Sequence, residues 1–439
     1  MTATATLSTA QGLHYGLLGM PLAFVALPLY VLLPHHYASQ YGMPLATLGA
    51  VLLAARLFDA FTDPLLGRWS DRLLARSHGA LLTTAALACA VLALGLAALF
   101  LPPVRGVQAL AAWALAALLV TSLAYSLVSI AHQAWGALLG GNEAQRSRIV
   151  AWREAAALVG VVLASVLSSL AGVGALVAVF AVLLAAGWLA WARAPRPALT
   201  PSAGAAMPWS ALWQPWRQAA FQRLMAVFVP SGIASAIPAT LVLFFIDDRL
   251  QLPANVQGAF LGAYFLSAAL SMPLWLRAVP RWGLARTWLA GMLLSVAVFI
   301  GAATLGAGDA WPFALVCVLS GLALGTDLAL PSALLAGVIA QDGGDARQGG
   351  GDARQGGAYF GWWNLAAKLN LALAAGLALP LLGLWGYAPG ARSEDALLPL
   401  TLAYAVLPCA LKLLAAACLY LLILRPRAAP TALVAPRSL

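Results

Sequence analysis

Two aspartates lie four residues apart inside an otherwise apolar stretch near the start of the chain. They are Asp59 and Asp63, in the segment Ala55–Pro64. Residues four apart share one face of a helix, so both carboxylates are directed at one place. Like charges this close resist joint ionisation, so either one carboxylate is protonated or a cation lies between them. The spacing predicts a site for a transported Na⁺ or H⁺. The alternative for Asp63, beside Pro64, is a cap at a helix end.

Hydroxyl and basic side chains elsewhere are expected to complete this site. Hard monovalent cations prefer oxygen ligands, and Thr62 and Ser129 each place a hydroxyl in apolar sequence. An ionisable side chain at bilayer depth costs ~2.5–3.5 kcal/mol on insertion scales, so each one present indicates a function. Lys368 lies ten residues into the apolar run 358–386. We expect it to pair with one of the two aspartates, with Arg56 as a further charge partner.

A second group of polar side chains is predicted to contact a transported organic molecule. His132 and Gln133 lie among apolar residues, and Asp327 and Asn364 occur in two later apolar runs. His132 has two interpretations, a substrate or proton ligand and a side chain hydrogen-bonded to a neighbouring helix. Asp327 likewise either lines a polar path or serves as a structural partner. The predicted substrate-binding residues are His132, Gln133, Trp135, Arg153, Asn364 and Asp327.

The second lysine, Lys412, follows Pro408 in the last apolar run. We expect the last run to form a helix at the periphery of the helix bundle. A lysine at such a place can extend its ammonium toward the bilayer surface. We therefore expect Lys412 to face lipid.

The elements that position these residues are membrane helices. Of 439 residues, 63% are hydrophobic and 9% are charged, whereas soluble proteins approach ~25% charged residues. Runs of about 20 apolar residues, the length needed to cross a bilayer, recur along the whole chain. Twelve are expected, at 12–34, 44–66, 78–102, 107–138, 148–171, 173–193, 219–246, 256–276, 284–305, 311–339, 358–386 and 398–424.

Arginine placement gives the orientation. If the N-terminus is cytoplasmic, the outward loops hold Arg105, Arg249 and Arg392, while the other loop arginines and those of the C-terminal tail all lie inward. Cytoplasmic loops carry the excess of Lys and Arg, so both termini are predicted to be cytoplasmic. The first run lacks the features of a cleaved signal peptide, and we expect it to remain. This places the protein in the inner (plasma) membrane.

A longer polar segment divides the chain. It is predicted as a cytoplasmic linker, 194–216, between six-helix bundles at 1–193 and 217–439. Two six-helix halves joined by one long loop are typical of the major facilitator superfamily, whose halves rock around a midplane site. Gly67, Asp71 and Arg72, in the loop after the second run, are predicted gating residues. The loop 277–286 occupies the equivalent place in the second half.

Several motifs resemble the glycoside–pentoside–hexuronide:cation symporters, the family of the melibiose carrier. They are Tyr15-Gly16, the stretch 56–72 with its two aspartates, Ala134 to Leu138, Arg146 to Arg153, and Gly357 to Leu369. The resemblance covers most of the chain. It implies that Asp59, Asp63, Thr62 and Ser129 form the cation site and that Lys368 is essential nearby. It also implies symport of a sugar or glycoside.

Two positions depart from the sugar carriers of that family. Where those carriers hold sugar hydroxyls with acidic side chains, this chain has Ala23 and His132. A related branch, the sodium-dependent lysophosphatidylcholine symporters, resembles the same cation site but lines its path with apolar residues. Cation-coupled symport of a lysophospholipid or another amphipathic solute is therefore the first alternative.

Other function classes are weaker. Proton-coupled efflux by antiport is the second alternative, because exporters also use membrane carboxylates. Ligand sensing without transport is a further one. No nucleophile–base pair, metal cluster or phosphate-binding loop indicates an enzyme, and the net charge of +10 forms no dense basic run for nucleic acid. We expect no cofactor beyond the coupling ion, and a monomer in the bilayer.

Overall fold

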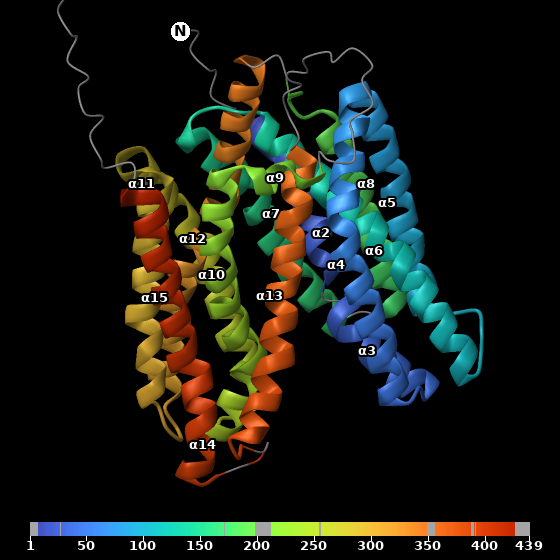
Figure 1. The fold of residues 1–439 in the computed structure, drawn as a ribbon. Helices are drawn as coiled ribbons and strands as arrows, with labels where there is room; N and C mark the ends of the chain where they lie inside the picture. The colour runs from blue at the N-terminus through green and yellow to red at the C-terminus, as the bar shows by residue number, and fades with distance from the viewer. Residues whose placement is uncertain are drawn as a thin grey trace, which may run out of the picture.

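The computed structural model describes residues 8–26, 28–170, 172–197, 212–253, 256–348, 356–387, 390 and 392–425. Within these ranges the chain is helical, without strands (Figure 1). In the first half the helices are α1 (Thr9–Gly16), α2 (Gly19–Phe24), η1 (Pro28–Leu32), α3 (Leu33–Tyr41), α4 (Leu45–Arg76), α5 (His78–Phe100), α6 (Val107–Leu138), α7 (Glu143–Leu170) and α8 (Val173–Ala192). The rest are α9 (Gln214–Arg217), α10 (Ala219–Phe244), η3 (Phe245–Arg249), α11 (Gln257–Phe299), η5 (Ile300–Thr304), α12 (Ala310–Gln348), α13 (Gly356–Leu384), α14 (Glu394–Thr401), η6 (Leu402–Val406), α15 (Leu407–Leu419) and η7 (Tyr420–Leu424).

These helices make twelve membrane spans in the described part of the chain. Eight helical stretches there are long and apolar enough to cross a bilayer. One of them, Gln257–Thr304, is 48 residues long and changes direction at Gly283, so it holds two spans. The three remaining spans are α4 with 32 residues, α13 with 29, and the consecutive short helices α1, α2, η1 and α3. The predicted all-helical twelve-span architecture is therefore confirmed.

Two local features explain where the helices depart from simple rods. Pro21 and Pro28 lie in the first span, and proline interrupts a helix because it lacks an N–H and clashes with the preceding turn. This span is accordingly broken into short segments. Gly283 has φ 77°, a left-handed conformation that glycine adopts without the clash a Cβ would cause. It joins the predicted spans 256–276 and 284–305 by a sharp bend.

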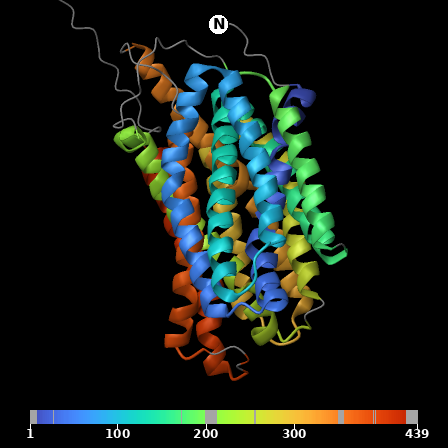
Figure 2. The ribbon, with the colours of Figure 1, turned by 90° about the vertical axis from the view of Figure 1, so that its right-hand side faces the viewer.

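The helices form two bundles that lie side by side. Figure 1 shows α2 to α8 mainly on the right and α10 to α15 on the left, with the first and last described segments at the same upper end; Figure 2 shows the same elongated packing from the side. The predicted linker 194–216 begins after α8 and ends near α9, and its residues 198–211 lie outside the described ranges. We call the end that bears the termini the terminal face.

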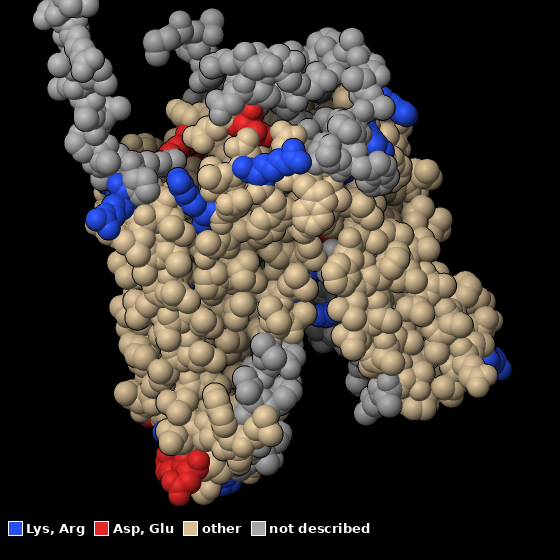
Figure 3. Space-filling view, viewed as in Figure 1, with Lys and Arg blue, Asp and Glu red and all other residues tan. Residues whose placement is uncertain are grey.

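The surface has the polarity of a protein that crosses a bilayer. Figure 3 shows Lys and Arg side chains along the upper end of one face and a broad band without charged side chains below them. The two bundles meet near the terminal face and part toward the lower end, and a basic side chain is visible inside the cleft between them. The molecule is thus closed at the terminal face and open at the opposite end.

Candidate functional site

A buried charge cluster joins the two bundles. We define the carboxylate cluster as Asp59, Asp63, Ser126 and Lys368. Lys368 Nζ lies 2.7 Å from Asp59 Oδ2 and 2.8 Å from Asp63 Oδ2. It also donates to Ser126 Oγ at 2.9 Å, and that hydroxyl donates to Asp59 Oδ1 at 2.8 Å. The predicted pairing of Lys368 with the two aspartates is present in the structure.

Three helices position this cluster. Asp59 and Asp63 lie one turn apart on α4, and their exposed fractions are 5% and 0%. Ser126 lies on α6 of the same bundle, whereas Lys368 reaches across from α13 of the other bundle. If both carboxylates are ionised and the lysine is protonated, the cluster carries a net charge of −1. This excess negative charge can be balanced by one further monovalent cation or by a neighbouring arginine.

The hydroxyl in the cluster is a residue that sequence reasoning missed. Ser129, the predicted ligand, instead accepts a hydrogen bond from Gln133 Nε2 at 2.9 Å. Thr62 donates to the backbone oxygen of Asp59 at 3.0 Å, so this bond ties its hydroxyl to its own helix. Ser126 precedes Ser129 by three residues and therefore lies on the same face of α6, one turn away. That spacing is the signal that would have found it.

A small cavity opens beside Asp59. Its volume is 40 Å³, and Arg56, Leu118 and Ser122 are among the residues that line it. A cavity of this size, with Arg56, Asp59 and Ser122 in its wall, has room for a water molecule or a small ion. Arg56 and Asp59 thus line the same cavity, and the role of Arg56 as a further charge partner stays a prediction.

A larger cavity lies between the two bundles. This central cavity has a volume of 310 Å³, near the lower limit of about 300–1,000 Å³ for small-molecule sites. The rings of Phe228 and Trp363 stack at its edge, with centroids 3.6 Å apart. The residues that line it are Gly19, Leu22, Ala23, Tyr125, Ser129, His132, Gln133, Arg153, Glu154, Ala157, Phe228, Asp327, Leu328, Ser332 and Trp363.

Four of the six predicted substrate-binding residues line the central cavity, and two do not. His132, Gln133, Arg153 and Asp327 are at its wall. Trp135 is fully buried and donates from Nε1 to the backbone oxygen of Pro195 at 2.9 Å, so this bond and its packing make it a structural residue. Asn364 is not among the residues that line the cavity.

The polar residues of the central cavity are held by partners. His132 Nε2 lies 2.8 Å from the backbone oxygen of Tyr15, and the Tyr15 hydroxyl donates to the backbone oxygen of His132 at 3.2 Å. The reading of His132 as a side chain bonded to a neighbouring helix agrees with this geometry. Arg153 forms an ion pair with Glu154 at 2.5 Å. The wall of the cavity therefore contains both a guanidinium, from Arg153, and a carboxylate, from Glu154.

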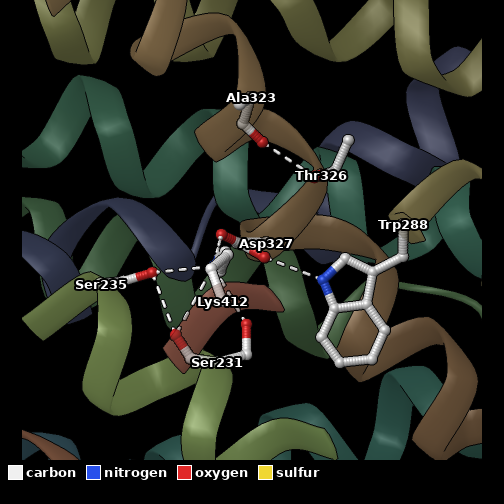
Figure 4. Close-up of polar contacts among 7 residues, drawn as sticks. All are labelled: Ser231, Ser235, Trp288, Ala323, Thr326, Asp327 and Lys412. Atoms are coloured by element: carbon white, nitrogen blue, oxygen red, sulfur yellow. Dashed lines mark hydrogen bonds and ion pairs between the residues drawn. The ribbon is translucent and has the colours of Figure 1, made fainter. Parts of the chain in front are cut away.

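The expectation that Lys412 faces lipid is wrong. Its side chain is only 4% exposed, and Nζ lies 2.5 Å from Asp327 Oδ2. The same ammonium donates to Ser231 Oγ at 3.0 Å and to Ser235 Oγ at 3.1 Å, as Figure 4 shows. Trp288 Nε1 donates to the other oxygen of Asp327 at 2.8 Å. The last span packs into its bundle at this level, because burial of the ammonium against Asp327, Ser231 and Ser235 is far cheaper than exposing a charge to hydrocarbon.

The predicted gating residues lie where the bundles meet at the terminal face. Asp71 accepts hydrogen bonds from the backbone N–H groups of Gly357 at 2.7 Å and Ala358 at 2.8 Å. Both lie in the first turn of α13, and a carboxylate at a helix N-terminus satisfies free N–H groups and complements the helix dipole. Arg72, next to Asp71, is partly buried.

Two further contacts hold this face closed. A Cβ on Gly67 would lie 2.0 Å from the backbone oxygen of Gly357, so only glycine permits this approach of α4 to α13. Glu143 accepts a hydrogen bond from the backbone N–H of Leu284 at 2.8 Å, directly after the bend at Gly283. The carboxylates of Asp71 and Glu143 thus both belong to the first bundle, and both accept hydrogen bonds from backbone N–H groups of the second.

Comparison with known proteins gives the family. A family model described as MFS/sugar transport protein matches residues 13–425. Similar solved structures include a bacterial homologue of the iron transporter ferroportin in an outward-facing state (TM-score 0.68, 15% identity, covering 94% of this chain and 98% of that one). They also include the fucose:proton symporter of E. coli (TM-score 0.63, 15% identity, 93% and 98%) and the human organic anion transporter MFSD10 (TM-score 0.62, 20% identity, 93% and 98%).

At these identities the solved structures establish the fold, and the family match extends over nearly the whole chain. No protein of curated function matches the sequence. Among the described residues, no group of three or more His, Cys, Asp or Glu side chains is arranged to hold a metal ion. The chain belongs to the MFS/sugar transport protein family and is a multi-pass membrane transporter with the twelve-helix major facilitator fold, not an enzyme.

Proposed function

We propose that this transporter is a symporter that couples the inward movement of Na⁺ or H⁺ to that of a small polar organic solute, of the sugar or glycoside type. The observation that carries the proposal is the ammonium of Lys368 held between Asp59 and Asp63 across the two bundles. A cation that enters the cluster competes with this ammonium for the same oxygens. Cation binding therefore changes the contact that links the bundles, which is what coupling requires.

The closed terminal face supports a direction of movement. With both termini in the cytoplasm of a cell whose plasma membrane holds the protein, as the arginine distribution predicts, the open end faces outward. Cation and solute then enter from outside, and the bundles rock to open the terminal face. Each cation moving inward gains ~2.3 kcal/mol per 100 mV of membrane potential, in addition to its concentration gradient.

The chemistry of the central cavity supports a polar solute. Arg153, Gln133 and Asp327 provide donors and acceptors, and the stacked rings of Phe228 and Trp363 provide an apolar surface. A sugar has hydroxyl groups at its rim and apolar C–H faces, so it suits both. The family described as sugar transport and the similar fucose:proton symporter point the same way.

Two alternative functions can be tested by the same uptake experiment. A lysophospholipid or another amphipathic solute is favoured by Ala23 and Leu22, which leave part of the cavity wall apolar. Proton-coupled efflux is the other, because the carboxylate cluster can serve an exchange as well as a symport. Symport and antiport differ in the direction in which the cation gradient drives the solute.

The test is uptake by purified protein in proteoliposomes. One mixture of glycosides, hexuronides and lysophospholipids is offered with an inward Na⁺ gradient, an inward H⁺ gradient, an outward H⁺ gradient or no gradient, and the contents are measured by mass spectrometry. We expect accumulation of a sugar or glycoside above equilibrium under one gradient. Accumulation of lysolipid alone would replace the substrate class, and accumulation driven only by a gradient in the opposite direction would replace symport by antiport.

The choice between two serines tests the composition of the cation site. Ser126→Ala is expected to raise the cation concentration for half-maximal uptake on the order of tenfold, since a hydrogen bond to a charged group contributes ~1.5–3 kcal/mol. Ser129→Ala, one turn away on the same helix, is the matched control and should leave that concentration within about twofold. A larger effect of Ser129→Ala would assign the ligand to Ser129 instead.

A close glycine contact tests the role of the terminal face. Gly67→Ala places a methyl group against the backbone oxygen of Gly357 and should disfavour the closed arrangement by about 1–3 kcal/mol, which corresponds to a ~5- to 150-fold shift in population. We expect a matching loss in the initial rate of uptake per inserted molecule. Gly49→Ala is the control on the same helix, because no atom lies within 4 Å of its added Cβ. Equal rates in the two variants would contradict the gating role.

A further inference from the structure

A second large cavity lies inside the C-terminal bundle. This inner cavity has a volume of 310 Å³ and is lined by residues of α10, α11, α12, η6 and α15. Aromatic side chains form much of its wall, namely Phe260, Tyr264, Phe265, Phe299 and Tyr404. Most of the remaining lining is aliphatic. A ligand that fills it must therefore be mainly apolar, because apolar contact is the chief interaction the cavity offers.

The polar end of the inner cavity is electrically neutral. It is formed by Ser235, Asp327 and Lys412, which Figure 4 shows converging on one point. Lys412 and Asp327 form an ion pair at 2.5 Å, so their charges compensate each other. A ligand that brought its own charge into this apolar surrounding would lack a counter-charge and would bind at a large cost. The neutral end thus favours an uncharged ligand.

The hydrogen bonds at this end also select the ligand's polar group. The three N–H groups of Lys412 have acceptors in Asp327, Ser231 and Ser235. The hydroxyl of Ser235 donates to the backbone oxygen of Ser231 at 3.2 Å. The N–H groups of Lys412 and the hydroxyl hydrogen of Ser235 are thus already engaged in hydrogen bonds. The Asp327 carboxylate and the Ser235 oxygen still have lone pairs that can accept one. A hydroxyl group that donates a hydrogen bond is therefore the polar group that fits.

We propose that the inner cavity is a second binding site, which takes a neutral, mainly aromatic molecule carrying one hydroxyl group, such as a phenol or naphthol. No residue of the carboxylate cluster lines it. Asp327 lines both the inner and the central cavity. The site is thus separate from the cation site, and it touches the solute path at a single carboxylate.

Four cysteines provide reporters for a test. Cys317 and Cys409 line the inner cavity, whereas Cys89 on α5 and Cys418 on α15 do not. The probe is 2-naphthol, the thiol reagent is N-ethylmaleimide, and mass spectrometry of the full-length protein in proteoliposomes gives the alkylation rate at each cysteine. At ten times its dissociation constant, naphthol should slow alkylation of Cys317 and Cys409 about tenfold and leave Cys89 and Cys418 unchanged.

Two related probes test the proposed ligand chemistry. Naphthalene lacks the hydroxyl and should protect more weakly, and 2-naphthoate carries a charge and should not protect. Equal protection of all four cysteines would overturn the proposal, because it would show partition into the lipid alone. Protection by naphthoate equal to that by naphthol would also overturn it, as would a failure of both cavity thiols to react while Cys418 does.

Two variants locate the effect. Ala239→Phe fills the cavity from α10 and should abolish protection, whereas Leu266→Phe on α11 adds bulk outside the lining and should preserve it. Asp59→Asn, which removes the proposed cation site, should leave naphthol protection unchanged. Protection that persists in Ala239→Phe would place the probe elsewhere. The inner site can thus fail or hold independently of the proposed symport.

Discussion

Replacement of Asp59 with asparagine is expected to abolish cation-driven accumulation while leaving a folded, membrane-inserted protein. Asparagine has nearly the same size, and its amide oxygen still accepts a hydrogen bond from Ser126. The change removes one charge, so that Asp63 and Lys368 remain as a neutral pair with no need of a further cation. At 100 mV one coupled cation supports about 50-fold accumulation, and this factor should fall to about one.

Exchange of solute at equal concentrations on both sides separates loss of coupling from loss of folding. This exchange needs no driving ion, so Asp59→Asn should retain it. Asp247→Asn is the matched control, because Asp247 is exposed and bonds to Gln257 at 2.6 Å, away from the cluster. It should leave accumulation at the level of the unaltered protein. Undiminished accumulation by Asp59→Asn would show that Asp59 does not carry the coupling.

The charged residues of the carboxylate cluster could be predicted from the sequence because short stretches of sequence identify each of them. Asp59 and Asp63 lie on one helix face by spacing alone, and Lys368 is too deep in its apolar run for a role at the bilayer surface. A buried ammonium requires a carboxylate partner, and the apolar runs contain few carboxylates that could pair with Lys368. The position of α6 along its axis relative to α4 and α13, however, is set by how these helices pack. That position decides which of the two serines, one turn apart on the same face, meets Asp59, and it is Ser126.

The number of spans was also predictable, whereas their lengths and breaks were not. Hydrophobic runs show what crosses a bilayer, but α4 continues to Arg76, beyond the predicted span 44–66. In this extension Asp71 accepts hydrogen bonds from the first turn of α13, a long-range contact that the α4 sequence alone does not reveal. The first span extends from Thr9 to Tyr41 as short helices, since each proline breaks the hydrogen-bond ladder.

Lys412 was placed wrongly because hydropathy cannot distinguish a lipid-facing from a bundle-facing side. Its partners Ser231 and Asp327 are 181 and 85 residues away in the chain, so no local pattern joins them. The aromatic pair of Phe228 and Trp363 is likewise far apart in the chain and could not be predicted from it. Long-range pairs of this kind are the part of a membrane bundle that requires the folded structure.

The burial of Lys412 leads to a second large expected effect. Lys412→Met leaves the carboxylate of Asp327 in the bundle without its counter-charge, and breaking a buried ion pair in this way costs ~3–5 kcal/mol. Asp327→Asn is milder, because the Lys412 ammonium keeps Ser231 and Ser235 as acceptors and the new amide oxygen can still accept from Trp288. We expect a clear fall in melting temperature for the first variant and a smaller one for the second.

The double variant Lys412→Met/Asp327→Asn distinguishes the loss of a pair from the loss of a side chain. It contains no unpaired charge, so it should recover most of the stability lost in Lys412→Met and melt close to Asp327→Asn. The measurement is thermal unfolding in one detergent, in which the fraction of protein that remains monodisperse is recorded at each temperature. If the double variant were as unstable as Lys412→Met, the cost would arise from the lost lysine contacts rather than from an uncompensated carboxylate. Since charge compensation is the reason for expecting a neutral ligand in the inner cavity, that result would also remove one support of the naphthol site.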